Sequence, residues 1–237
     1  MYKRFLFTML IGIAAGIVGP LWAADVASFV DLGFSADGRY YMFGQYGVEA
    51  NTLKPWAELF VVDVPKNNFV PGGKLSYTHN NSIIQGQDGT GALYTLLANN
   101  GPLFKKYNID FLRQSRPLYL SMDGNSSAMA ANPSIDFRDF ESGDTFRAAL
   151  VHFEEGTGDS LKSSFYINLE RTGSDGTKKN YLVGSPSIKR PLITSYRICR
   201  VMIAPKDGSM IFVIEMTKKS ASGSGNDIRY MIEAIHL

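Results

Sequence analysis

Two stretches of this chain, residues 30–64 and 200–234, follow one pattern of turns and apolar segments at a constant offset of 170 positions. Each contains an Asp-Gly pair, Asp37-Gly38 in the first and Asp207-Gly208 in the second, followed by a strongly apolar segment. Asp and Gly favour tight turns, so each stretch reads as a strand, a turn, a strand, a polar loop and a third strand. Such a repeat constrains the fold because both ends of the chain must then be built from the same antiparallel unit. We expect the two units to lie side by side, closing the sheet edge where the two halves of the chain meet.

The rest of the chain also has the pattern of a β protein. Short alternating, aromatic or β-branched segments are bounded by Gly, Asn, Asp and Pro. In one of them Phe165, Ile167 and Leu169 alternate with polar residues, as a half-buried antiparallel strand requires. The sequence predicts strands near residues 26–34, 39–46, 57–64, 74–78, 116–121, 134–138, 145–153, 163–171, 179–184, 192–203, 209–216 and 227–236.

Only one region follows a helical pattern. Apolar residues recur at steps of three or four from Leu93 to Tyr107, with one longer gap at Asn99-Asn100-Gly101-Pro102. This gap combines a residue that ends helices with one that begins them, so we expect helices near 90–99 and 102–108. The fold class predicted is mainly β, with antiparallel sheets forming a sandwich or an incomplete propeller and one or two short helices near 90–108. No linker divides the chain, so we predict a single β-rich domain over residues 24–237.

The first 23 residues have the features of an export signal. Lys3 and Arg4 precede an apolar stretch, and Leu21-Trp22-Ala23 ends in a small residue suited to cleavage before Ala24. The alternative is a retained anchor, because the uncharged run from residue 5 to 24 has about the ~20 residues that span a bilayer. Signal removal predicts a periplasmic or secreted protein with no membrane span.

Charge and cysteine content narrow the function classes. The chain has 24 Lys and Arg against 22 Asp and Glu. Removal of Lys3 and Arg4 leaves 22 of each, so we expect no nucleic-acid partner, which would require a basic face. Cys199 is the only cysteine and lies in a predicted strand, so we expect a small buried apolar group and no intramolecular disulfide. An export signal without disulfides fits a bacterial envelope compartment.

Two resemblances follow from particular segments. Phe34-Ser35-Ala36-Asp37-Gly38, with Phe43 and an apolar strand after it, resembles one hairpin of the TolB-type, WD40-like β-propeller blades. A full propeller needs about four to eight blades, and the chain has two such half-signatures. The chain as a whole is similar to a family of bacterial predicted secreted proteins, domain of unknown function 2259 (DUF2259), through the colinear segments 30–38, 43–47, 116–120, 137–140, 163–167 and 228–233. This second resemblance implies an exported bacterial protein with no assigned activity.

The strongest sign of catalysis is Gly158-Asp159-Ser160-Leu161, which reads as the GDSL tetrapeptide of a lipase and esterase family. That chemistry requires a histidine to take the serine proton, and His152 and His236 are the candidates for pairing with Ser160. The tetrapeptide lies far from the start of the chain, and Gly, Asp and Ser also make ordinary hairpin turns. The three histidines are dispersed, so we predict no metal site and no cofactor. We assign no catalytic residues and keep a secreted serine hydrolase as the alternative function.

A binding role has a different basis. Tyr46, Trp56 and Tyr77 lie beside predicted turns, where large rings with a polar group often contact partners or saccharides. The competing interpretation is that Trp56 begins a strand and packs over its hairpin. We predict a non-catalytic binding or interaction module of the cell envelope, with an envelope protein or a saccharide as its partner.

Overall fold

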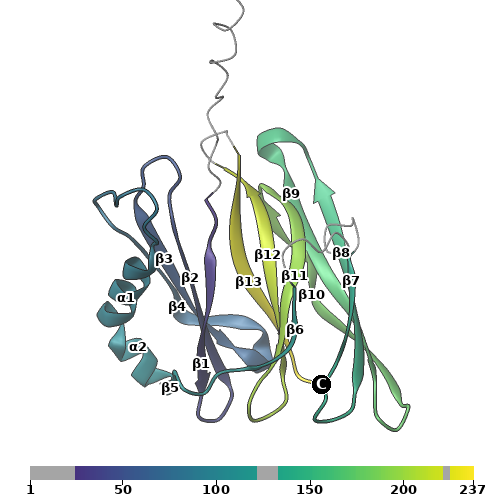
Figure 1. Ribbon diagram of the computed structural model, residues 1–237. Coiled ribbons are helices and arrows are strands. Elements are labelled where there is room, and N and C mark those ends of the chain that lie inside the picture. Colours follow the sequence, from purple (N-terminus) through teal and green to yellow (C-terminus); the bar gives the residue numbers. More distant parts are fainter. Residues whose placement is uncertain (1–24, 122–132, 221–224) are drawn as a thin grey trace, which may run out of the picture.

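The computed structural model describes residues 25–121, 133–220 and 225–237 (Figure 1). The predicted signal peptide, residues 1–23, therefore lies outside the described residues. The described residues form three antiparallel sheets and two short α-helices, which confirms the predicted fold class. Figure 1 shows the three sheets standing face to face, with both helices covering the free face of the first.

The N-terminal sheet has the strand order β4-β3-β2-β1-β5. Its strands are β1 (Ser28–Ser35), β2 (Tyr40–Val48), β3 (Pro55–Asp63), β4 (Asn68–Thr78) and β5 (Ile109–Asp110), and the short 3-10 helix η1 (Val64–Lys66) connects β3 to β4. The middle sheet has the order β13-β12-β11-β6. It contains β6 (Arg116–Leu120), β11 (Ile193–Ile203), β12 (Met210–Lys219) and β13 (Asn226–Ile235).

The outer sheet has the order β10-β9-β8-β7. Its strands are β7 (Ser134–Arg138), β8 (Thr145–Glu155), β9 (Lys162–Thr172) and β10 (Lys178–Pro191), with the 3-10 helix η3 (Gly158–Ser160) between β8 and β9. β4 and β10 extend furthest beyond the strands that the sequence predicts at 74–78 and 179–184. β4 and β10 both contain breaks in register, where the alternation of side chains is lost and the pattern no longer indicates a strand.

The repeat predicted from the sequence is present in the structure as two three-stranded units, β1-β2-β3 and β11-β12-β13. The glycines of the two Asp-Gly turns both adopt positive φ, 79° at Gly38 and 71° at Gly208. One buried cluster joins the units, and it contains pairs of residues at the offset of 170: Phe34 and Ala204, Tyr41 and Ile211, Phe43 and Val213, Val62 and Ile232, and Val64 and Ala234.

The expected arrangement of these units was wrong in one respect. They do not extend one sheet side by side but belong to different sheets that pack face to face. The physical reason is that the same positions are apolar on one face of each unit, so each unit buries that face against its counterpart. The resemblance to propeller blades is not confirmed.

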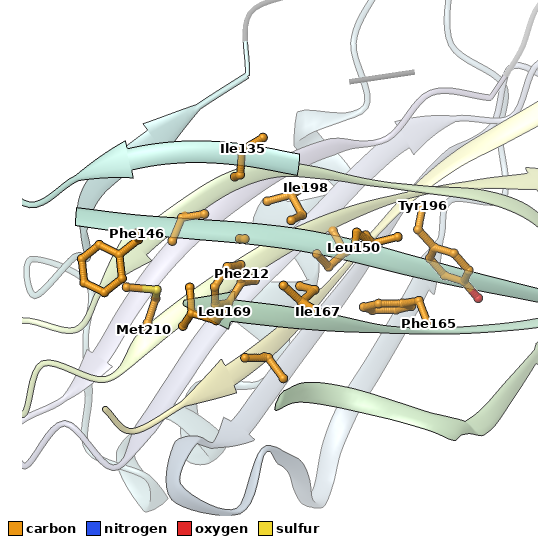
Figure 2. Close-up of a cluster of buried hydrophobic side chains, with 14 of the residues drawn as sticks. Ile135, Phe146, Leu150, Phe165, Ile167, Leu169, Tyr196, Ile198, Met210 and Phe212 are labelled. Carbon is orange, nitrogen blue, oxygen red and sulfur yellow. The ribbon is translucent and has the colours of Figure 1, made fainter. Parts of the chain in front are cut away.

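The middle sheet is covered on both faces. Its second face packs against the outer sheet through a cluster in which Phe165, Ile167 and Leu169 meet Ile198 and Phe212 (Figure 2). Full burial of each such side chain contributes about 1.5–3 kcal/mol. This sheet therefore holds the two outer layers together.

The helices α1 (Thr90–Asn99) and α2 (Gly101–Lys106) lie where the sequence predicts them. Leu93 and Leu96 of α1 and Phe104 of α2 are buried against the face of the N-terminal sheet that points away from the middle sheet. The side-chain amide of Asn100 donates to the carbonyl oxygen of Leu96 at 2.8 Å and ends α1. Cys199 is buried, as its position in an apolar strand predicts.

Candidate ligand-binding cleft

A cleft of about 840 Å³ opens along one side of the stacked sheets. Its walls include the edge strands of all three sheets, namely β4, β13 and β10. Further lining residues come from β2, β3, β11 and β12 and from the segment at η1. The stacking of the sheets therefore creates the cleft, which no single hairpin would form.

Part of the cleft wall is a row of phenylalanine rings on the N-terminal sheet. Phe29, Phe43, Phe60 and Phe69 come from β1, β2, β3 and β4, one from each strand. Successive ring centroids lie 5.6, 4.8 and 5.5 Å apart. These distances are typical of interacting aromatic pairs. The last three rings of the row line the cleft and make part of its wall apolar.

Basic side chains surround this aromatic row. Five of them line the cleft, against the two carboxylates of Glu58 and Glu233. Three of the five are paired with acidic groups: Lys66 with Asp63 at 3.8 Å, Arg190 with Glu233 at 3.4 Å and Arg229 with Asp25 at 2.6 Å.

The other two basic groups are Lys74 and Lys218, which have no carboxylate within 4.0 Å in the described part of the chain. The Lys74 ammonium lies over the ring of Phe69, 4.0 Å from its centroid, in a cation–π contact. Lys74 belongs to the N-terminal sheet and Lys218 to the middle sheet. Two walls of the cleft thus carry an ammonium group without an ion-pair partner, while one lining carboxylate, that of Glu58, also has no ion pair and accepts a hydrogen bond from Gln45.

Glu233 fixes the three sheets around the cleft. It belongs to β13 of the middle sheet, accepts a hydrogen bond from the amide of Asn67 beside the N-terminal sheet, and pairs with Arg190 of the outer sheet. Burial raises the pKa of the Glu233 carboxyl, while the hydrogen bond from Asn67 and the charge of Arg190 oppose that rise. The Arg190 guanidinium also lies over the rings of Phe165 and Tyr196, at 5.0 and 5.9 Å from their centroids.

Asn67 is held in the conformation that this contact requires. It ends η1 with a φ of 47°, in the left-handed region that asparagine tolerates better than most residues. Its side-chain oxygen accepts the main-chain N–H of Ala234 at 2.8 Å, while its amide nitrogen donates to Glu233. One side chain therefore attaches the N-terminal sheet to two consecutive residues of β13.

The structure does not bring Tyr46, Trp56 and Tyr77 together. Tyr46 and Tyr77 both pair with Ala57 across β2, β3 and β4, so they share the face of the N-terminal sheet that the helices cover. Trp56 precedes Ala57 and points to the opposite face. It is only 6% exposed, donates to Asp25 at 3.1 Å and lies under the Arg229 guanidinium at 4.2 Å. Trp56 is therefore packed inside the protein near the start of β3.

The hydrolase candidates are also dispersed. Ser160 lies in η3, and its hydroxyl donates to the carbonyl oxygen of Thr157 at 2.8 Å, in the hairpin turn that its neighbours predict. His152 packs edge-on against Tyr196, with ring centroids 5.1 Å apart. Neither His152 nor His236 makes a hydrogen bond to Ser160.

One cluster does combine a serine, a histidine and a carboxylate, at the second Asp-Gly turn. The Ser209 hydroxyl donates to Asp207 at 2.9 Å, and His236 Nδ1 lies 3.3 Å from the same hydroxyl and 3.9 Å from the carboxylate. In a catalytic triad the serine and the carboxylate contact different ring nitrogens. Here both approach Nδ1, and Ser209 is fully buried. The cluster therefore stabilises the turn.

Comparison with known families identifies the chain. The family described as predicted secreted protein (DUF2259) matches residues 42–236. The chain belongs to this family. No curated protein and no solved structure matches the DUF2259 chain. Within the described residues, none of the helices has both the length and the apolar character needed to cross a membrane.

Proposed function

We propose that this DUF2259 protein is a non-catalytic binding module of the bacterial cell envelope, periplasmic or secreted, and that the cleft between the three sheets holds its ligand. Membership of a family of predicted secreted proteins and the basic and apolar pattern of residues 1–23 support the location. The cleft lies at the meeting point of three layers, where ligand sites of this size are common.

The observation that carries the proposal is the combination of an aromatic surface with two unneutralised ammonium groups. Phe60 and Phe69 offer apolar area, and Lys74 and Lys218 stand on two walls of the same cleft. The charged Lys and Arg side chains elsewhere around the cleft are already compensated by Asp and Glu. An aromatic surface with free cations suits a ligand that is both apolar and acidic.

The test is a titration with anilinonaphthalene sulfonate, an aromatic anion whose fluorescence rises in apolar sites. The protein is expressed from its full sequence and purified from the exported fraction. We compare it with the double variant Lys74→Gln, Lys218→Gln. A matched control is Lys105→Gln, Lys179→Gln, which removes the same charge from α2 and β10 at exposed positions away from the cleft.

The dye has one sulfonate, and an ammonium about 4 Å from it contributes about 1 kcal/mol in water-like surroundings, so the double variant loses about 1 kcal/mol. This corresponds to about a fivefold rise in Kd. The control keeps the Kd of the unmodified protein. If the two double variants bind the dye equally well, the cleft is not the binding site and the proposal fails.

A further inference from the structure

Apolar side chains line the cleft on both sides of the edge strand β13. On one side Phe60 and Phe69 border the buried cluster between the N-terminal and middle sheets. On the other side Met216 and Met231 border the cluster between the middle and outer sheets, and the half-exposed Ile188 of β10 lines the same cleft. A ligand that covers both surfaces must bend around a strand edge. A flexible hydrocarbon chain can do so, and methionine side chains adapt to its shape.

Several polar side chains of the cleft wall are already bonded within the protein. The amide of Gln45 donates to Glu58 at 2.7 Å, and its oxygen accepts the main-chain N–H of Tyr230 at 2.7 Å. Asn67 likewise uses both ends of its side chain on two residues of β13. These two amides also occupy the edge of β13 within the cleft. A saccharide or an extended peptide would need hydrogen-bonding groups that are engaged here, so the lining favours a ligand with few polar groups.

Lys74 is placed to bind one anionic group beside the apolar surface. In the register of β3 and β4 it lies opposite Phe60, whereas Phe69 lies opposite Val62, two residues further along β3. Glu58 is on the same face, two residues from Phe60 in the other direction. The Lys74 ammonium is 4.0 Å from the centre of the Phe69 ring, so it is directed away from the Glu58 carboxylate. An acid that contacts this ammonium at the Phe69 end is therefore kept apart from Glu58.

Lys218 lies further along β13 and does not reach the same group. It pairs with Asp227 across β12 and β13, so the Asp227 carboxylate shares its face of the sheet. Asp227 is five residues from Ile232, or about 17 Å along an extended strand. Ile232 belongs to the cluster that the phenylalanine rings border. Among the described residues, Lys74 is therefore the cation without an ion-pair partner that lies beside these rings.

We propose that the ligand of the cleft is an unbranched fatty acid, whose carboxylate binds Lys74 and whose hydrocarbon chain covers Phe60 and bends over the edge of β13 toward Met231 and Ile188. This inference rests on the proposed function, because it names the ligand class of the same cleft. The cleft volume of about 840 Å³ is within the range of small-molecule sites. Each buried methylene group then adds to the affinity, while one ion pair fixes the direction of the chain.

The first experiment measures how affinity depends on chain length. Octanoate, decanoate and dodecanoate compete with anilinonaphthalene sulfonate for the exported protein, each below the concentration at which it forms micelles. A fully buried methylene group contributes about 0.8 kcal/mol, which is about a fourfold change in affinity. Because the cleft is open along one side, we expect the affinity to rise about two- to fourfold for each added methylene group.

Two variants test the two ends of the ligand. Lys74→Gln should weaken decanoate binding about fivefold, as expected for one ammonium about 4 Å from a carboxylate, and should leave binding of the uncharged decanol unchanged. Lys105→Gln on α2 is the matched control and should change neither. Ile188→Ser should weaken dodecanoate binding about threefold or more, because its half-exposed side chain contacts the hydrocarbon. Leu182→Ser, at an exposed position of the same strand outside the cleft, should not weaken it.

The fatty acid is the wrong ligand if the dye binds in the cleft and its displacement does not depend on chain length. The assignment also fails if Lys74→Gln weakens decanoate and decanol binding equally, or if an acidic peptide or an N-acetylated saccharide displaces the dye where alkanoates do not. Equal dye binding by the cleft and control double variants rejects the proposed function as well. The dye titration and the chain-length series thus separate failure of the site from failure of the ligand class.

Discussion

Replacement of Phe165 by alanine tests whether the three stacked sheets unfold as one domain. Phe165 is fully buried between the outer and middle sheets, with its ring 4.5 Å from that of Tyr196 and under the Arg190 guanidinium. Removal of a buried phenylalanine side chain costs about 3–5 kcal/mol in lost transfer energy and cavity formation. For a chain of this size that corresponds to a fall in Tm of about 6–20 °C.

The assay follows two signals from different layers. The chain has two tryptophans, Trp22 in the predicted signal peptide and Trp56, which is buried on the face of the N-terminal sheet that meets the middle sheet. Tryptophan fluorescence of the processed protein therefore reports on the N-terminal side of the stack, and far-ultraviolet circular dichroism reports on all three sheets. In a single domain, Phe165→Ala lowers both midpoints together although Phe165 lies in the outer sheet.

The control is Leu182→Ala in the same outer sheet. Leu182 is 59% exposed, so its truncation should change the free energy of unfolding by no more than about 0.5 kcal/mol. The reasoning is refuted if Trp56 fluorescence keeps its original midpoint while the dichroism separates into two transitions. The outer sheet would then be a separate folding unit, and the prediction of one domain would be wrong.

Three further predictions concern single residues. Burial raises the pKa of the Glu233 carboxyl above 4.5, so the folded protein binds this proton more tightly than the unfolded chain does. The contribution of this group to the free energy of unfolding therefore falls as pH rises above about 4.5. As pH rises above about 4.5, the free energy of unfolding of Glu233→Gln should therefore rise relative to that of the unmodified protein in urea unfolding, and a difference that falls instead would contradict this. Asn67→Gly keeps the left-handed backbone but loses both hydrogen bonds to β13, so it should cost about 1–3 kcal/mol, whereas exposed Asn68→Ala should be nearly neutral in the same assay. Burial raises the pKa of Cys199 to about 12, so a disulfide reagent at pH 8 should modify it only after unfolding, and rapid reaction of the native protein would show the burial to be wrong.

Local patterns were sufficient to predict most of the fold. The alternation around Phe165 and the three- and four-residue spacing from Leu93 to Tyr107 depend only on neighbouring residues, and both elements lie where expected. The repeat could be predicted for the same reason, because each unit has its own pattern of turns and apolar residues. The packing of the two units could not be predicted, because contacts between residues far apart in the sequence decide whether the units extend one sheet or stack face to face.

The cleft was missed for a related reason. Phe43 and Phe60 stack only because β2 and β3 pair in one particular register, which the sequence does not state. Glu233 alternates with apolar residues, as a solvent-facing position would, but the middle sheet is covered on both faces and the carboxylate is buried. Trp56 was predicted to bind a partner because it follows a turn. In the structure, the alternation of side chains along β3 places it on the opposite face of the sheet from Tyr46 and Tyr77.

The order of the layers does not follow the order of synthesis. β11, β12 and β13 come last in the chain, yet they form the central layer that both other sheets need for their burial. During synthesis, Phe34 and Tyr41 emerge some 170 positions before Ala204 and Ile211, the counterparts that cover them. The first half of the protein must therefore remain incomplete, with apolar surface open to aggregation or to chaperones, until nearly the whole chain has been made.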